Sequence, residues 1–97
     1  MDLRQEILET AIKATVGDRN KSYGHPSGSM QIMADLINAY FKTQFTMADM
    51  AIIMVCNKLS RIPNNKLHID NNVDGAAYLA IQAELQQMLD GINNGKS

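Results

Sequence analysis

The fold of this chain follows from residues 46–63, which read TMADMAIIMVCNKLSRIP. Thr46 stands where a helix N-cap is expected, and Asp49 stands three residues later, where a capping-box side chain reaches back to the cap. The eight residues after Thr46 are apolar apart from Asp49, and Pro63 cannot continue a helix. We therefore predict a central helix that runs to Ile62 and is covered by other elements on most sides.

Three further segments carry apolar residues at helical spacing, and none alternates with the two-residue period of a half-buried strand. The first should begin behind Asp2 as a possible cap and end at Gly17. The second should be capped by Ser27 or Ser29, and the last should start near residues 70–72. The sequence therefore predicts an all-α fold of four helices.

Length and charge narrow the class of protein further. A chain of 97 residues with 45% apolar residues can form one small core, so we expect a single domain over residues 1–90 with a flexible tail over 91–97. Such a small core favours assembly as a homo-oligomer. A net charge of -1 argues against binding to a nucleic-acid polymer. One cysteine, no signal peptide and no apolar run long enough for a membrane indicate a cytoplasmic protein.

The segment between the first two predicted helices, residues 17–26, reads GDRNKSYGHP and is rich in hydrogen-bond donors. Arg19, Lys21, Tyr23 and His25 carry donors of the kind that bind phosphate or another anion. The simpler interpretation is a solvated turn between two helices. We keep both, and count these four residues as candidate ligand-binding residues.

A second group of polar residues follows the apolar part of the central helix. Lys58 and Arg61 lie one turn apart, and Asp70, Asp74 and Tyr78 are spaced four residues apart on the next helix. The cations could bind an anion or only complement the helix dipole. The carboxylates could ligate Mg²⁺ or pair with the cations, and ion pairing is the interpretation we favour. These five residues complete the candidate binding site.

Other residues that could bind a metal, bind a partner or react have structural explanations. His25 and His68 have no partner at a recognised metal-ligand spacing. Most of the seven methionines fall on helical stripes and are expected to fill the core, although they could form a Met-rich surface. Cys56 lies among apolar neighbours in mid-helix, so we expect it to be buried rather than reactive.

The order of these motifs resembles a small domain family of phages and prophages that has no assigned function. The family pattern reads roughly G-D-R-x-x-x-Y-G-x-P, then D-x-x-x-M-M-x-x-x-K-x-A-R, then H-x-D-x-x-x-D-x-A-G-Y-A. The likeness extends over about residues 7–85, with Ser60 in place of the usual Ala and Ala77 in place of Gly. It implies a phage-type protein that acts in the host cytoplasm.

A fainter likeness connects the helical layout to the all-α nucleoside triphosphate pyrophosphatases of the MazG type. Those enzymes hold Mg²⁺ with an E-x-x-E pair on one helix and an E-x-x-D pair on the next. This chain offers only Asp49, Asp70 and Asp74 for such a metal site, at spacings that do not match. The four-carboxylate cage is absent from the sequence, whereas the cationic and aromatic residues could still hold a nucleotide.

We therefore expect a protein that binds and sequesters a small phosphate-bearing nucleotide without catalysis and without a cofactor. The resemblance to phage proteins suggests a cyclic or NAD-derived immune signal of the host as the nucleotide. One alternative is a MazG-like pyrophosphohydrolase that depends on Mg²⁺. A second is a helical adaptor that binds a host protein through a Met-rich face. The expected partners are the nucleotide and further copies of the chain, with no nucleic-acid polymer and no membrane.

Overall fold

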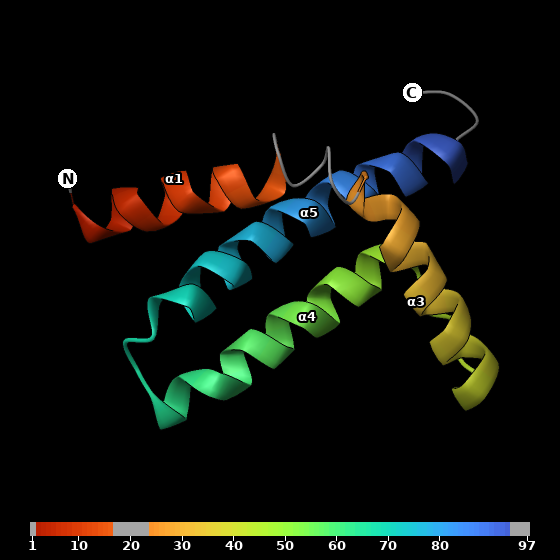
Figure 1. Cartoon of the computed structure of the whole chain (residues 1–97). Helices are drawn as coiled ribbons and strands as arrows, with labels where there is room; N and C mark the ends of the chain where they lie inside the picture. Colours follow the sequence, from red (N-terminus) through yellow and green to blue (C-terminus); the bar gives the residue numbers. More distant parts are fainter. Residues whose placement is uncertain (1, 17–23, 94–97) are drawn as a thin grey trace.

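The computed structural model describes residues 2–16 and 24–93, and all regular structure within them is helical. The elements are α1 (Leu3–Thr15), α3 (Pro26–Phe41), α4 (Met47–Arg61), the 3-10 turn η1 (Ile62–Asn64) and α5 (Ile69–Asn93). The four α-helices confirm the predicted all-α class. Figure 1 shows α1, α5 and α4 side by side, with α3 crossing at one end of this layer. Within the described ranges, no helix combines the length and apolarity needed to cross a membrane.

Both ends of α4 follow from the residues that surround them. The Thr46 hydroxyl accepts a hydrogen bond from the Asp49 backbone N–H at 3.1 Å, and the Asp49 carboxylate accepts one from the Thr46 N–H at 2.9 Å. This reciprocal pair is the capping box that the sequence predicts. At the other end, α4 closes at Arg61, one residue before the predicted end. Pro63 falls inside η1, where its fixed φ and missing N–H are tolerated in the first turn.

The caps of α3 and α1 and both ends of α5, which starts at Ile69, differ from the prediction. His25, rather than Ser27 or Ser29, caps α3: its imidazole Nδ1 accepts from the Ser27 N–H at 3.2 Å, and Pro26 is the first helical residue. The final helix, α5, continues to Asn93, three residues into the segment expected to be a tail. Asp2 has the backbone position of an N-cap for α1, but its side chain makes no capping bond. Gly17 and residues 94–97 lie outside the described residues.

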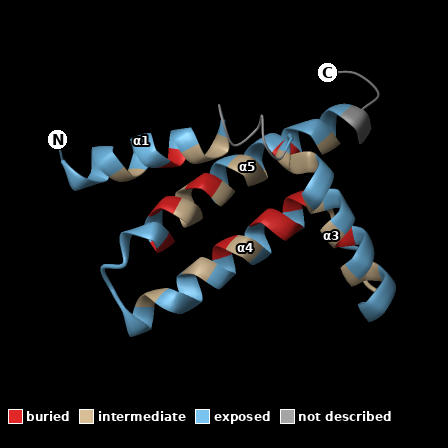
Figure 2. Cartoon of the chain, viewed as in Figure 1, coloured by how far each residue is buried: buried red, intermediate tan, exposed pale blue. Residues whose placement is uncertain are grey.

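The core is made largely of small side chains where helices meet in pairs. Helix α5 packs against both α4 and α1, and α4 also packs against α3. One cluster joins Met47 and Ala48 of α4 to Leu85 of α5, and a second joins Ala11 of α1 to Val73 and Ala77 of α5. Met50 and Leu85 are the only large side chains of the described residues that are fully buried. Figure 2 shows the buried residues as short patches along the facing sides of the helices.

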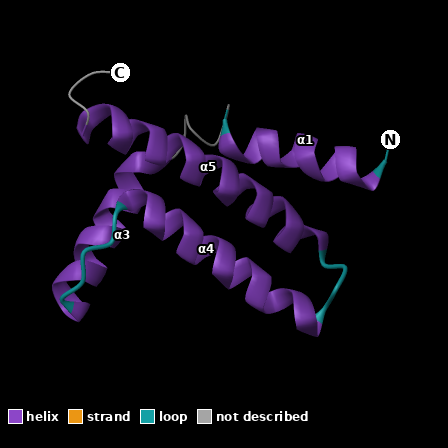
Figure 3. Ribbon diagram, turned by 180° about the vertical axis from the view of Figure 1, so that it is seen from behind, coloured by secondary structure: helices purple, strands orange, loops and turns teal. Residues whose placement is uncertain are grey.

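The chain turns back after α3 through residues 42–46, which run alongside that helix (Figure 3). Asn38 holds this segment in place with three hydrogen bonds of 2.8 Å each: its amide donates to the Phe45 carbonyl, and its oxygen accepts from the Phe45 N–H and the Thr43 hydroxyl. Lys42 takes the left-handed conformation, with φ 58°, as the helix ends. These contacts bring the start of α4 back beside α3.

The far side of α4 is open to solvent. Cys56 is exposed there, so the prediction that it is buried is wrong. The apolar neighbours of Cys56 in the sequence indicated a covered position, but Ile52 and Ile53, one helical turn before it, are also exposed. Burial of α4 is confined to the side that meets α3 and α5.

Candidate functional site

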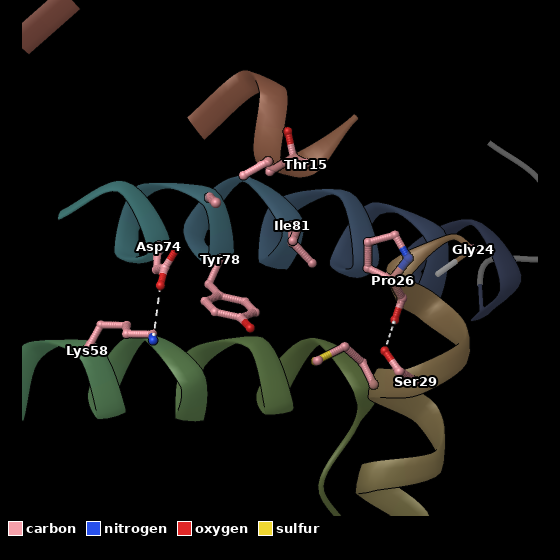
Figure 4. Close-up of a pocket in the computed structure, with 11 residues that line it drawn as sticks. Thr15, Gly24, Pro26, Ser29, Lys58, Asp74, Tyr78 and Ile81 are labelled. Atoms are coloured by element: carbon pink, nitrogen blue, oxygen red, sulfur yellow. Dashed lines mark hydrogen bonds and ion pairs between the residues drawn. The ribbon is translucent and has the colours of Figure 1, made fainter. Parts of the chain in front are cut away.

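A pocket of about 320 Å³ lies where four helices meet, at the end of α1, the start of α3 and the facing sides of α4 and α5. Thr15 and Ala14 line it from α1, and Gly24 and Pro26 line it from the approach to α3. Figure 4 shows these elements around the pocket. No single helix could form it, because its walls come from segments that are distant in the sequence.

Lys58 of α4 and Asp74 of α5 form an ion pair on the pocket wall, with 3.0 Å between Lys58 Nζ and Asp74 Oδ2. The two side chains point toward one another across the gap between the helices (Figure 4). Lys58 is only 14% exposed, whereas Asp74 is 40% exposed. Lysine is rarely buried to this degree unless it has an anionic partner. The pair therefore places a largely desolvated cation at the edge of a cavity.

Tyr78 extends the same wall by one helical turn. It follows Asp74 by four residues on α5, so both side chains project from one face of the helix. Figure 4 shows its ring pointing from α5 toward α4. Ala77 and Ile81 of α5 and Met30 of α3 supply apolar surface beside it. The wall thus combines an ion pair, a half-buried phenol and an apolar patch.

The start of α3 contributes the positive end of a helix dipole. Pro26 and Ser29, both in the first turn of α3, line the pocket. The helix dipole places partial positive charge at this end and favours an anion. Pro26 has no N–H, and the N–H groups of Ser27 and Gly28 already donate to His25, so this end supplies a field and no free donors from these three residues. The pocket therefore has two sources of positive potential, the α3 terminus and Lys58.

His25 fixes the start of α3 rather than lining the pocket. Its Nδ1 accepts from Ser27, so its proton is on Nε2, which donates to Glu84 of α5 at 2.7 Å. This bond ties the beginning of α3 to α5. In the structure His25 positions the helix end beside the pocket, and its role in ligand binding stays a prediction.

Other predicted site residues lie apart from this pocket. Arg61 is exposed in the last turn of α4, and Asp70 is exposed at the start of α5, with its carboxylate 3.8 Å from His68. Neither is among the residues that line the pocket. Asp49 is occupied in the capping box of α4.

The carboxylates of the hydrolase alternative are consequently dispersed. Asp49 caps α4, Asp70 lies near His68, and Asp74 pairs with Lys58. Over residues 2–16 and 24–93, no three His, Cys, Asp or Glu side chains gather as they would around a metal ion.

Arg19, Lys21 and Tyr23 lie outside the described residues. The stretch that contains them joins Val16 to Gly24, and the pocket is lined by Thr15 before it and by Gly24 after it.

Sequence reasoning missed Glu84 and the pocket-lining role of Thr15 and Ser29. Glu84 meets His25 across 59 positions of sequence, and no local spacing signals such a contact. Thr15 and Ser29 look like ordinary residues of helix ends. Their importance comes only from the way α1 and α3 approach α5.

The methionines do not form a continuous exposed face in the described residues. Met47 and Met50 are buried, and Met33 and Met54 are half-buried. Met88 is exposed on α5, distant in sequence from the others. These placements give little support to the adaptor alternative.

Comparison with known proteins places the pocket within a shared domain. The family model described as a domain of unknown function, DUF6378, matches residues 6–86, which include every residue that lines the pocket. The Gene 55 protein of Mycobacterium phage D29 is 33% identical over 76 residues, covering 78% of this chain and 50% of the relative. The Gene 55 protein of Mycobacterium phage L5 is 33% identical over 81 residues, which cover 82% of this chain and 52% of the relative. The chain thus spans about half the length of these curated relatives, and no solved structure matches it.

Proposed function

Because the chain belongs to the DUF6378 family, which includes phage proteins, we propose that it binds a small phosphate-bearing nucleotide in the four-helix pocket without turning it over. The observation that carries this proposal is the largely buried Lys58, which lines the pocket and is held there by Asp74. A protein that needed only a stable core would gain little from such a pair, since desolvation offsets most of its attraction.

The positive groups of the pocket suit a phosphate. An ammonium has three donors, and Asp74 needs one of those on Lys58, so two remain for phosphate oxygens. The N-terminus of α3, with Pro26 and Ser29 at the wall, adds a favourable dipole. Both groups are fixed before the ligand arrives, which lowers the entropy cost of binding.

The remaining wall suits a nucleoside. The Tyr78 ring offers a flat aromatic surface, and Ala77 and Ile81 extend it with apolar area. A volume of about 320 Å³ lies within the range of pockets that hold small ligands. Asp74, at 40% exposure, has carboxylate surface left to accept bonds from ribose hydroxyls or from a base N–H.

Sequestration, rather than hydrolysis, is supported by the engagement of the carboxylates. Metal-assisted attack of water on a phosphoanhydride needs several carboxylates around one or two ions. Here Asp49 belongs to the cap of α4, and Asp70 and Asp74, one turn apart on α5, contact His68 and Lys58 respectively. In a phage protein, uptake of a cyclic or NAD-derived signal of the host would require binding alone, and Arg19, Lys21 and Tyr23 are proposed to supply further contacts to it.

The proposal predicts nucleotide-dependent stabilisation that requires Lys58. Thermal melting is measured with AMP, ADP, ADP-ribose and a cyclic dinucleotide, each with Mg²⁺ and with a chelator. We expect at least one nucleotide to raise Tm under both conditions. Lys58→Met removes the charge and keeps much of the length, and should weaken binding by about 1.5–3 kcal/mol, the strength of a charge-assisted hydrogen bond.

Lys66→Met is the matched control, because Lys66 is exposed between η1 and α5 and does not line the pocket. It should bind like the unmodified protein. Since Lys58→Met leaves Asp74 unpaired, the double variant with Asp74→Asn separates lost binding from lost folding. After heating, anion-exchange chromatography should return the nucleotide intact. Equal affinity in the Lys58 and Lys66 variants would refute the pocket, and Mg²⁺-dependent release of pyrophosphate would establish the hydrolase instead.

A further inference from the structure

The outer side of α3 carries an apolar stripe that the chain itself leaves uncovered. Ile32, Leu36 and Tyr40, which we call the α3 stripe, are 62%, 67% and 80% exposed. They recur every four residues, so they form one line along the helix. Isolated exposed apolar residues are common, but three large ones aligned on one helix are candidates for an interaction surface. Leu8, Ile12 and the C-cap Val16 form a second such line along α1, at 58%, 59% and 51% exposure. Unlike the α3 stripe, this second line is bordered by charges of both signs, Arg4 and Glu9.

The α3 stripe lies opposite the contacts that hold α3 in the fold. Helix α3 packs against α4 through Ala34, its one buried residue, and the segment 42–46 covers another side. Figure 1 shows α3 projecting away from the layer formed by α1, α5 and α4. The stripe is therefore accessible to a second molecule without any change in the fold.

The total exposed surface of the chain is large for its mass. The chain exposes 6974 Å², whereas a folded monomer of this mass exposes about 5,500 Å². Contact with a second copy would cover part of this exposed surface. The exposed area includes residues outside 2–16 and 24–93, so the position of the contact is inferred from the exposed fractions of the α3 side chains.

The charge of the surface favours a second copy of the same chain. A two-fold interface places each residue near its own equivalents, so a charged patch would repel itself. Asp35 is the single charged residue of α3, and its carboxylate accepts a bond from Gln31 at 2.9 Å. Met33 and Ala39, which flank the stripe, are uncharged, and Asp35, three residues after Ile32, is the one charge at its border. The stripe itself is uncharged and ends in a tyrosine, so it can pack against its own equivalent.

We infer that the α3 stripe is the contact surface of a homodimer, in which Ile32, Leu36 and Tyr40 of one copy pack against the same helix of the other. The contact lies on the opposite side of α3 from its packing against α4. Ile32, Leu36 and Tyr40 do not line the pocket, so dimer formation and nucleotide binding use different residues.

Sedimentation equilibrium of the full chain tests the inference. The unmodified protein should have twice the mass of one chain at micromolar concentration. Leu36→Glu and Tyr40→Glu each place a carboxylate in the stripe of both copies. Either variant should raise the dimer Kd by about 1,000-fold, because each of the two carboxylates in the dimer contributes a factor of about 30. Both residues are exposed in the single chain, so the variants should stay helical by circular dichroism.

Leu8→Glu is the matched control, because Leu8 is a leucine of α1 with a similar exposure of 58%. It should leave the mass of the dimer unchanged. A monomer at all concentrations of the unmodified protein would overturn the inference, and so would dimers that persist in both α3 variants. Equal dissociation by Leu8→Glu and Leu36→Glu would also overturn it, because the contact would then not be specific to α3.

Discussion

Lys58 shows what a local pattern can and cannot establish about a site. The sequence identified Lys58 and Arg61 as cations and Asp70 and Asp74 as carboxylates, and ion pairing as the favoured interpretation of the acids. The Lys58–Asp74 pair bears out that interpretation for one acid. Which cation meets which acid depends on how α4 crosses α5, and spacing along each helix carries no such information.

Asn38 is a single residue on which the path of the chain after α3 depends. Its side chain makes three hydrogen bonds, one to the Thr43 hydroxyl and two to the backbone of Phe45. Asn38→Ala should lower the free energy of unfolding by about 1–3 kcal/mol, because it removes these bonds and leaves the Phe45 N–H and carbonyl without a partner. Urea denaturation followed by circular dichroism measures this loss.

Asn57→Ala is the comparison for Asn38→Ala. Asn57 is exposed on α4, and its substitution should change stability by less than about 0.5 kcal/mol. A loss of the same size in both variants would show that the Asn38 bonds contribute nothing specific.

At the scale of elements, helix ends were predictable where the cap is a common one. The Thr46 and Asp49 pair gave the start of α4 correctly, because hydroxyl and carboxylate caps have a known spacing. His25 was not anticipated as the cap of α3, since imidazole seldom fills that role and serines follow it closely. The end of α4 moved by one residue because Pro63 fits inside a 3-10 turn.

The capping box makes a direct prediction about α4. Thr46→Ala removes the acceptor for the Asp49 N–H, and should lower the free energy of unfolding by about 1 kcal/mol. The same denaturation experiment measures the loss. Thr10→Ala serves as the control, since the Thr10 hydroxyl donates only to a carbonyl within α1 and alanine is the better helix former. A stability unchanged by Thr46→Ala would contradict a role for the cap in holding α4.

At the scale of the whole molecule, the number and type of helices could be predicted from the sequence, but the faces they cover could not. Apolar residues recur at helical spacing along α3, yet Ile32, Leu36 and Tyr40 are exposed. Cys56 was misplaced for the same reason. Periodicity shows that a helix has an apolar side, and only the packing of the whole chain shows whether that side meets the same chain, another copy or solvent.

The thin seam between α1 and α5 has a consequence for how the protein opens. Helix α1 has one buried residue, Ala11, which meets Val73 and Ala77. Ile7 and Ala76 beside them are only partly buried, so this contact buries little area. The first helix should therefore detach and reattach as a unit at a cost well below that of global unfolding. Its amide hydrogens should exchange with deuterium faster than those of α4, as measured by mass spectrometry of peptides from each helix.

A nucleotide in the pocket would make the detachment of α1 less frequent, because Ala14 and Thr15 at the end of α1 line the pocket together with Lys58 and Asp74. Occupancy should slow deuterium uptake in α1 while leaving α4 nearly unchanged. Equal exchange in α1 and α4 without nucleotide would show that the seam is stronger than its small side chains imply. The weak contact between α1 and α5 would also let a nucleotide enter, because the pocket is uncovered when α1 detaches and is closed again when α1 returns.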